Sequence, residues 1–244
     1  MMLHPMLEQL KALKLNGMLE ALEGQLKQPD IRQLSFEERL GLLLEHEISL
    51  RESKRLKRRL NTARLRTPAC FEDINFKATR QLDKSVVFAL ENCQWLRDHR
   101  NILISGSTGT GKTFLGEAFA HKACLKGFTS LSVRLPRFLD ELTQARADGS
   151  YSKRLHTISK IELLVLDDFA ISPFTDQQRR DFLEIIDDRY NKKSTIITSQ
   201  LEVKHWHSAI GDATLADAIL DRVVHNSYRF ELKGPTLRDE AWKQ

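Results

Sequence analysis

The later two-thirds of the chain alternates short apolar runs with longer amphipathic stretches, a pattern typical of a parallel α/β fold. Four runs have the length and the apolar or β-branched character of buried strands: residues 101–105, 129–133, 161–166 and 194–198. Fully buried parallel strands read as such continuous runs. Helical patterns lie between or beside them, over 114–126, from Pro136 onward, and over 175–190. The order predicts a parallel sheet covered on both faces by helices, with right-handed crossovers.

The N-terminal part of the chain shows helical periodicity only. Its leucines recur on one helical stripe, at Leu15, Leu19, Leu22 and Leu26. Pro29 interrupts this pattern, and Ser35 followed by Glu38 has the spacing of a capping box that opens a second helix. The apolar face of that helix holds Leu40, Leu43, Leu44 and Ile48. Because Thr67-Pro68 stops the pattern, we predict a small helical domain over 1–67 and an α/β domain over 68–244.

The turn between the first predicted strand and its helix fits the phosphate-binding pattern G-x-x-x-x-G-K-[ST] at every fixed position. Backbone N–H groups of such a turn, together with the helix N-terminus, surround phosphate oxygens. Lys112 would reach the β- and γ-phosphates, and the Thr113 hydroxyl would bind Mg²⁺. We assign eight residues to nucleotide binding: Gly106, Ser107, Thr108, Gly109, Thr110, Gly111, Lys112 and Thr113.

Two adjacent acids follow the third predicted strand. Ligands in open α/β sheets bind at the carboxyl ends of the strands, so Asp167 and Asp168 should face the phosphate loop. We assign Asp167 to the metal, opposite Thr113, and Asp168 to the attacking water of a hydrolysis reaction. Taken alone, a pair of acids after a strand is more often a solvated turn or a helix cap.

A further helix is predicted over roughly 78–96, ahead of the first strand. Phe71 and Phe76 precede it. These aromatic side chains could pack in the core, or they could line the adenine side of the nucleotide pocket.

Composition limits the class of protein. No apolar segment of the 244 residues approaches the roughly 18 needed to cross a membrane, and the N-terminus lacks a secretory pattern. The three cysteines, Cys70, Cys93 and Cys124, are widely spaced and form no CxxC pair, which favours reduced thiols in a cytoplasmic protein over a zinc site.

The net charge of +5 is modest, but its distribution is uneven. Residues 51–66 hold eight basic side chains against one acid, Glu52. Such a helix end attracts nucleic-acid phosphates without sequence selectivity. A solvated helix face and a docking site for an acidic protein are the alternatives. The candidate DNA-binding residues of this run are Lys54, Arg55, Lys57, Arg58 and Arg59.

The combined motifs resemble a known family. The phosphate loop, LLVLDDF, STIITSQ, VKHWHSAIGD and LADAILDRVVHNSYRFELKGPTLR together resemble the IstB-like branch of the AAA+ superfamily. These proteins are transposition helper ATPases of insertion sequences, related to bacterial helicase loaders and to the replication initiator. The resemblance covers nearly the whole chain. It implies a P-loop AAA+ sheet sandwiched by helices, with ATP and Mg²⁺ as cofactors, in a bacterial, cytoplasmic, DNA-associated protein.

The resemblance also assigns individual residues. Ser199, with Thr198 beside it, matches the first sensor, which touches the γ-phosphate or the attacking water. Arg222 matches the arginine finger that enters the site of a neighbouring subunit, and Arg238 could make a second-sensor contact. Further basic residues lie on segments that face DNA in this clade: Arg134, Arg137, Lys153 and Arg154.

Two positions depart from the family pattern. Asp168 stands where most AAA+ proteins carry glutamate, so its carboxylate reaches one methylene less, and we expect slow hydrolysis that a partner stimulates. Glu202 stands where a proline is expected.

The resemblance implies an ATP-dependent homo-oligomer on duplex DNA that delivers this target to its cognate transposase. A helicase loader that binds single-stranded DNA and a replicative helicase is the main alternative. A small-molecule kinase is disfavoured because no arginine-rich substrate lid is evident. An adaptor that binds ATP without hydrolysing it stays open.

Overall fold

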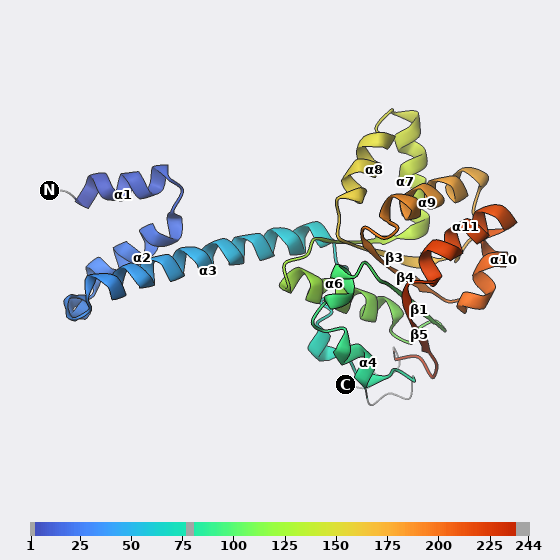
Figure 1. Cartoon of the computed structure of the whole chain (residues 1–244), viewed down its shortest axis with the longest axis horizontal. Coiled ribbons are helices and arrows are strands. Elements are labelled where there is room, and N and C mark those ends of the chain that lie inside the picture. Colours follow the sequence, from blue (N-terminus) through green and yellow to red (C-terminus); the bar gives the residue numbers. More distant parts are fainter. Residues whose placement is uncertain (1–2, 77–80, 238–244) are drawn as a thin grey trace. The chain divides into compact units, whose positions relative to one another are not determined.

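The computed structural model describes residues 3–76 and 81–237 (Figure 1). The chain forms two compact units, Met1–Arg58 and Arg59–Gln244. The division falls within helix α3 (Phe36–Ala63), whereas the predicted domain boundary at 67 lies after that helix ends. Within the described part of the chain, every helix is too short or too polar to span a membrane.

The first unit is helical, as predicted. It comprises α1 (Leu3–Ala12), α2 (Asn16–Lys27), the 3₁₀ turn η1 (Pro29–Gln33) and most of α3. The capping box is confirmed, because the Ser35 N–H donates to Glu38 at 2.7 Å and the Glu38 N–H donates to the Ser35 hydroxyl at 3.2 Å. The predicted apolar face of α3 is only partly covered within this chain, since Ile48 is 56% exposed.

A buried carboxylate joins α2 to α3 inside this unit. Glu47 accepts hydrogen bonds from the backbone N–H groups of Gly17 at 2.6 Å and Met18 at 3.1 Å, at the start of α2. Arg51 pairs with the same carboxylate at 2.5 Å, and this bond lowers the pKa of Glu47 against the opposing effect of burial. A Cβ at position 17 would lie 2.6 Å from the Glu47 Cα, so the close approach requires glycine.

The second unit is built on a five-stranded sheet in which every described pairing is parallel, in the order β2-β3-β4-β1-β5. The strands are β1 (Asn101–Gly106), β2 (Ser130–Arg134), β3 (Leu163–Phe169), β4 (Ser194–Ser199) and β5 (Ser227–Leu232). The first four match the predicted strands closely. The strand β5 was not predicted, because its alternation of exposed and buried residues differs from a continuous apolar run.

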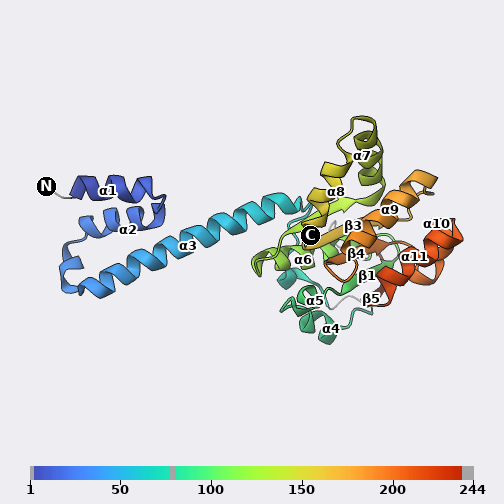
Figure 2. The same cartoon turned by 45° about the horizontal axis from the view of Figure 1, so that its top comes forward.

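Helices cover both faces of this sheet (Figure 2). On one face, η2 (Phe71–Asp73), α4 (Lys84–Ala89), α5 (Gln94–Arg97) and α6 (Lys112–Leu125) pack against Ile102, Ile104 and Val165. The opposite face holds Leu103, Leu164 and Ile197 and carries α7 (Leu135–Ala147), α8 (Tyr151–Ser159), α9 (Asp176–Arg189), α10 (Trp206–Ile210) and α11 (Ala213–Val224). A further 3₁₀ turn, η3 (Val203–His205), precedes α10. Alternate strand residues thus fill two separate cores.

The predicted helix over 78–96 is wrong as a single element. Residues 77–80 lie outside the described residues, and the remainder forms the two short helices α4 and α5. Asp83 caps α4 by accepting from the backbone N–H groups of Ser85 and Val86. The left-handed conformation of Cys93, with φ 60°, ends the turn between the two helices.

Phe71 and Phe76, which precede these helices, pack in the core, and this is one of the two alternatives predicted for them. Phe71 is 3% exposed, and its ring packs edge-on against those of Phe88 and Phe119. Phe76 is partly buried and stacks on Phe88 with ring centroids 5.5 Å apart.

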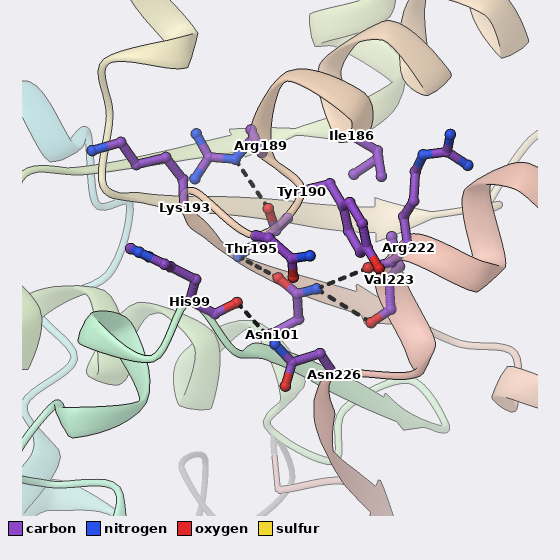
Figure 3. A pocket seen from close by; sticks show the side chains of 11 residues that line it. His99, Asn101, Ile186, Arg189, Tyr190, Lys193, Thr195, Arg222, Val223 and Asn226 are labelled. Atoms are coloured by element: carbon purple, nitrogen blue, oxygen red, sulfur yellow. Dashed lines mark hydrogen bonds between the residues drawn. The ribbon is translucent and has the colours of Figure 1, made fainter.

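A buried arginine connects α8, α9 and the segments at the starts of β3 and β4, and Figure 3 shows its bond to Thr195. Arg189 is 2% exposed and donates to the carbonyl oxygens of Ile158 at 3.1 Å, Ile161 at 2.9 Å and Ser194 at 2.5 Å. It also donates to the Thr195 hydroxyl at 3.0 Å. The guanidinium thereby gives charged donors to buried backbone oxygens of three segments, although the Ile158 carbonyl also accepts from the Ile161 N–H at 3.1 Å.

We predict that Arg189→Leu lowers the free energy of unfolding of the second unit by about 2–4 kcal/mol, because several buried carbonyl oxygens lose a charged donor. Chemical denaturation measures this change. Arg180→Leu, at an exposed position of the same helix, is the control and should change stability by less than about 0.5 kcal/mol. Equal stability of the two variants would contradict the bridging role of Arg189.

Candidate nucleotide-binding site

The predicted phosphate loop connects β1 to α6. Gly111 is the residue before α6 and has φ 89°, and Gly109 has φ 85°, both in the left-handed region that favours glycine. Lys112 and Thr113 form the first turn of α6, so the loop delivers its backbone N–H groups and both side chains to one end of the helix.

The segment that follows β5 supports this loop. A Cβ at Gly106 would lie 2.2 Å from the Leu232 carbonyl oxygen, and one at Gly109 would lie 2.0 Å from the Thr236 hydroxyl. The Leu237 N–H donates to the Gly109 carbonyl at 2.9 Å. Glycine at positions 106 and 109 is therefore needed for close backbone packing as well as for the turn.

A cavity of about 970 Å³ lies beside the loop, and the predicted residues Thr108, Gly109, Gly111, Lys112 and Thr113 line it. The Lys112 ammonium donates to the Ser107 carbonyl at 2.7 Å, and the Thr110 hydroxyl donates to the same oxygen at 2.8 Å. The structure thus brings the lysine and the loop to one wall of a cavity large enough for a nucleotide.

Asp167 is the centre of the polar network at the carboxyl end of β3. Its carboxylate, in a residue 2% exposed, accepts from the Thr113 hydroxyl at 2.9 and 3.1 Å and from the Thr198 hydroxyl. Carboxylate and hydroxyl oxygens are ligands that Mg²⁺ prefers, and Mg²⁺ commonly takes only one or two protein ligands besides substrate phosphates. Thr113 and Asp167 therefore fit the predicted metal pair.

A β-bulge brings the neighbouring acid to the same cavity. Adjacent strand residues normally point to opposite faces of a sheet, but the register between β3 and β4 shifts between Leu166 and Phe169. Asp168 has φ 62° within this irregularity, and both it and Asp167 line the cavity. Arg134, at the end of β2, pairs with Asp168 through Nε at 2.8 Å and Nη2 at 2.7 Å.

The structure places the hydroxyl of Ser199, the predicted sensor residue, away from the Asp167 carboxylate. The Ser199 hydroxyl is buried, donates to the Phe169 carbonyl at 2.9 Å and accepts from the Leu201 N–H at 3.1 Å. Thr198 instead faces Asp167 and accepts from the Asp168 N–H at 3.3 Å. The alternation of β4 explains the difference, because it places Thr198 with Ile196 on the α6 face. Gln200, just after β4, also lines the cavity and was not predicted.

Arg222 lies on α11, away from the nucleotide cavity of its own chain, and is absent from the described residues that line it. Its guanidinium pairs with Asp187 on α9 and donates to the Ala218 carbonyl at 2.7 Å. Asn101 fixes the backbone here, because its side chain donates to the carbonyls of Arg222 and Val223 (Figure 3).

Arg66 is a residue of the cavity that sequence reasoning missed. It belongs to the basic run before the predicted linker, and its guanidinium pairs with Asp167 and, at 3.3 Å, with Glu117 of α6. Burial lowers the pKa of Arg66, but the bonds and charges of these two carboxylates outweigh it and raise the pKa overall. A basic run alone gives no signal for such a contact, since most of its members are exposed.

The predicted DNA-binding residues fall into three groups. Lys54, Arg55, Lys57 and Arg58 are exposed on α3, whereas Arg59 is half-buried and donates to the Cys124 carbonyl at 2.9 Å. Glu141 joins two residues of α7 and α8, pairing with Arg137 at 3.2 Å and Arg154 at 3.3 Å, and Lys153 is exposed beside them. Arg134 lines the nucleotide cavity. Arg238 lies outside the described residues.

Solved structures share the architecture of about two-thirds to three-quarters of this chain. The DnaC helicase loader is 22% identical with a TM-score of 0.55, over 68% of this chain and 97% of that chain. The AMPPCP-bound replication initiator DnaA of Aquifex aeolicus is 20% identical with a TM-score of 0.59, over 74% of this chain and 55% of that chain. These likenesses support the AAA+ fold.

Sequence comparison extends over both units. An insertion-sequence ATP-binding protein (y4pL) of Sinorhizobium fredii is 44% identical over 98% of this chain and 97% of its own length. The ATP-binding protein of insertion sequence IS1162 of Pseudomonas fluorescens is 43% identical, over 82% of this chain and 87% of its own length. The profile of the family described as "IstB-like ATP binding protein" matches residues 8–244. With its phosphate loop and acids in place, this chain therefore belongs to the IstB-like ATP-binding family of insertion sequences.

Proposed function

We propose that this protein is an ATP-hydrolysing regulator of transposition that assembles on duplex target DNA and delivers it to a cognate transposase. The observation that carries the proposal is the cavity in which the phosphate loop meets Asp167 and Asp168, within a chain of an insertion-sequence family. A protein so equipped can couple the state of a bound nucleotide to assembly and release.

Within this cavity, each residue has a distinct task. The loop N–H groups and Lys112 bind the phosphates, and Thr113 and Asp167 would hold Mg²⁺, which neutralises phosphate charge when bound. Asp168 lies beside them and can orient a water molecule for in-line attack. Its ion pair with Arg134 occupies the carboxylate and favours slow basal hydrolysis.

The position of Arg222 supports a site completed by a second copy of the chain. On α11, it cannot serve the cavity of its own subunit without a large displacement, yet it is partly exposed, with 29% of its side chain accessible. An arginine supplied by a neighbour stabilises charge on the transferring phosphoryl group. ATP would then favour assembly, and hydrolysis would favour release.

The basic residues of α7 and α8 support DNA binding by this unit. Arg137, Lys153 and Arg154 are exposed, and Glu141, which pairs with Arg137 and Arg154, neutralises only part of the charge of the three residues. Lysine and arginine side chains of this kind contact phosphates and give little sequence selectivity. The exposed basic residues of α3 would add a second contact of the same type.

We predict that Arg222→Ala leaves ATP binding intact but lowers the hydrolysis rate by ~10³ or more, because the phosphoryl charge loses its partner. Phosphate release measures the rate. Mixing this variant with Lys112→Ala should restore part of the activity, since each chain supplies the half-site that the other lacks. Arg180→Ala, at an exposed position of α9, is the control. Normal hydrolysis by Arg222→Ala alone, or no recovery in the mixture, would contradict a shared site.

For DNA, we predict large ATP-dependent complexes on duplex DNA in sedimentation experiments, and weaker binding to single strands. Alanine substitution of Arg137, Lys153 and Arg154 together should reduce the slope of log affinity against log salt by up to about three.

The matched control for this surface is the triple alanine variant of Lys126, Lys160 and Lys192, which removes the same charge at other exposed positions of the second unit. Preference for single strands would favour a helicase-loader function instead. An unchanged salt slope in the α7–α8 variant would contradict the proposed DNA surface.

A further inference from the structure

We propose that Arg66 is a reversible occupant of the metal position at Asp167. Its guanidinium neutralises this carboxylate while no metal–nucleotide complex is bound, and it withdraws when such a complex binds. The inference rests on the proposed metal role of Asp167 and adds to it a residue from the segment that directly follows α3.

The contacts of Asp167 show why it needs a cation. Thr113 and Thr198 give hydroxyl hydrogen bonds, which orient the carboxylate without cancelling its charge. Arg66 adds a positive charge through Nη2 on Oδ2, at a residue that is only 2% exposed. A buried carboxylate without such compensation is costly, so the ion pair stabilises the nucleotide-free site.

Oδ2 of Asp167 cannot hold the Arg66 guanidinium and a divalent metal ion at the same time. Oδ2 accepts from both Arg66 and Thr113, and Thr113 is the hydroxyl that is expected on the metal. A divalent ion between Thr113 and Asp167 would therefore meet the guanidinium at the same oxygen. Because both cations would contact Oδ2, their mutual repulsion makes the metal-bound state and the Arg66-paired state of Asp167 mutually exclusive.

The backbone around Arg66 allows its side chain to move alone. Glu117 is completely buried and accepts from the backbone N–H groups of Arg66 at 3.2 Å and Thr67 at 2.8 Å. The hydroxyls of Thr67, at 2.5 Å, and Ser132, at 3.2 Å, also donate to Glu117, so it keeps four hydrogen bonds when the Arg66 Nε bond of 3.3 Å is released. Glu117 thus anchors the main chain to α6, while 38% of the Arg66 side chain is exposed along the cavity wall.

If Arg66 and Mg²⁺ exchange at Asp167, removing Arg66 should change the Mg²⁺ dependence of nucleotide binding. Arg66→Ala should lower the Mg²⁺ concentration needed for half-maximal binding of a non-hydrolysable ATP analogue by about tenfold, within the range usual for linked binding events. Fluorescence titration of the full-length protein, at fixed analogue and varied MgCl₂, measures this shift. In EDTA without nucleotide, the same variant should melt at a lower temperature than the wild type, because Asp167 has lost its cation.

Two variants serve as controls. Lys160→Ala removes one positive charge from an exposed position of the same unit and should leave the Mg²⁺ titration unchanged. Arg66→Lys keeps the charge but loses the planar guanidinium that reaches two carboxylates. Its Mg²⁺ concentration for half-maximal binding should lie between those of the wild type and Arg66→Ala.

The outcomes separate this inference from the proposed function. If Arg66→Ala needs the same or more Mg²⁺ than the wild type, Arg66 does not compete with the metal and the inference is wrong, while the metal role of Asp167 stands. If analogue binding by the wild type is independent of Mg²⁺, both the inference and the metal role fail.

Discussion

The carboxylate of Asp167 is the point on which the second unit depends, because four segments meet there. Thr113 reaches it from α6, Thr198 from β4 and Arg66 from the segment after α3, while Asp167 itself ends the apolar run of β3. A buried charge tolerates few arrangements, since it is costly unless hydrogen bonds and a cation compensate it. The network therefore fixes the helix, the strand ends and the entering chain around one cavity.

The bulge between Leu166 and Phe169 brings both Asp167 and Asp168 to the nucleotide cavity. A regular strand would turn Asp167 and Asp168 to opposite faces, and one of them would leave the cavity. With the bulge, one carboxylate faces Thr113 and the other faces the end of β2. Each of the two aspartates meets its own arginine, Arg66 at Asp167 and Arg134 at Asp168.

Sequence reasoning predicted the features that depend on local pattern. The strand–turn–helix around the phosphate-loop motif, four of the five strands and the capping box at Ser35 follow from residue spacing within a few positions, and the structure confirms these elements. The family match confirms the resemblance inferred from the motifs.

What the sequence did not predict depends on register and on distant contacts. The choice between Thr198 and Ser199 rests on which face of β4 each occupies, and neighbouring hydroxyl residues carry no signal for that. Arg66 lies 101 positions from Asp167 in the chain, so no spacing rule links them. The predicted helix over 78–96 was wrong because an apolar pattern does not reveal the left-handed turn at Cys93.

The most direct test of the central claim is calorimetric titration of Asp167→Asn and wild type with a non-hydrolysable ATP analogue, in Mg²⁺ and in EDTA. If Asp167 holds the metal that accompanies the nucleotide, wild type binds more tightly in Mg²⁺ than in EDTA and Asp167→Asn shows the same affinity in both. A variant that keeps the full Mg²⁺ dependence of the wild type would contradict the claim that this carboxylate organises the site.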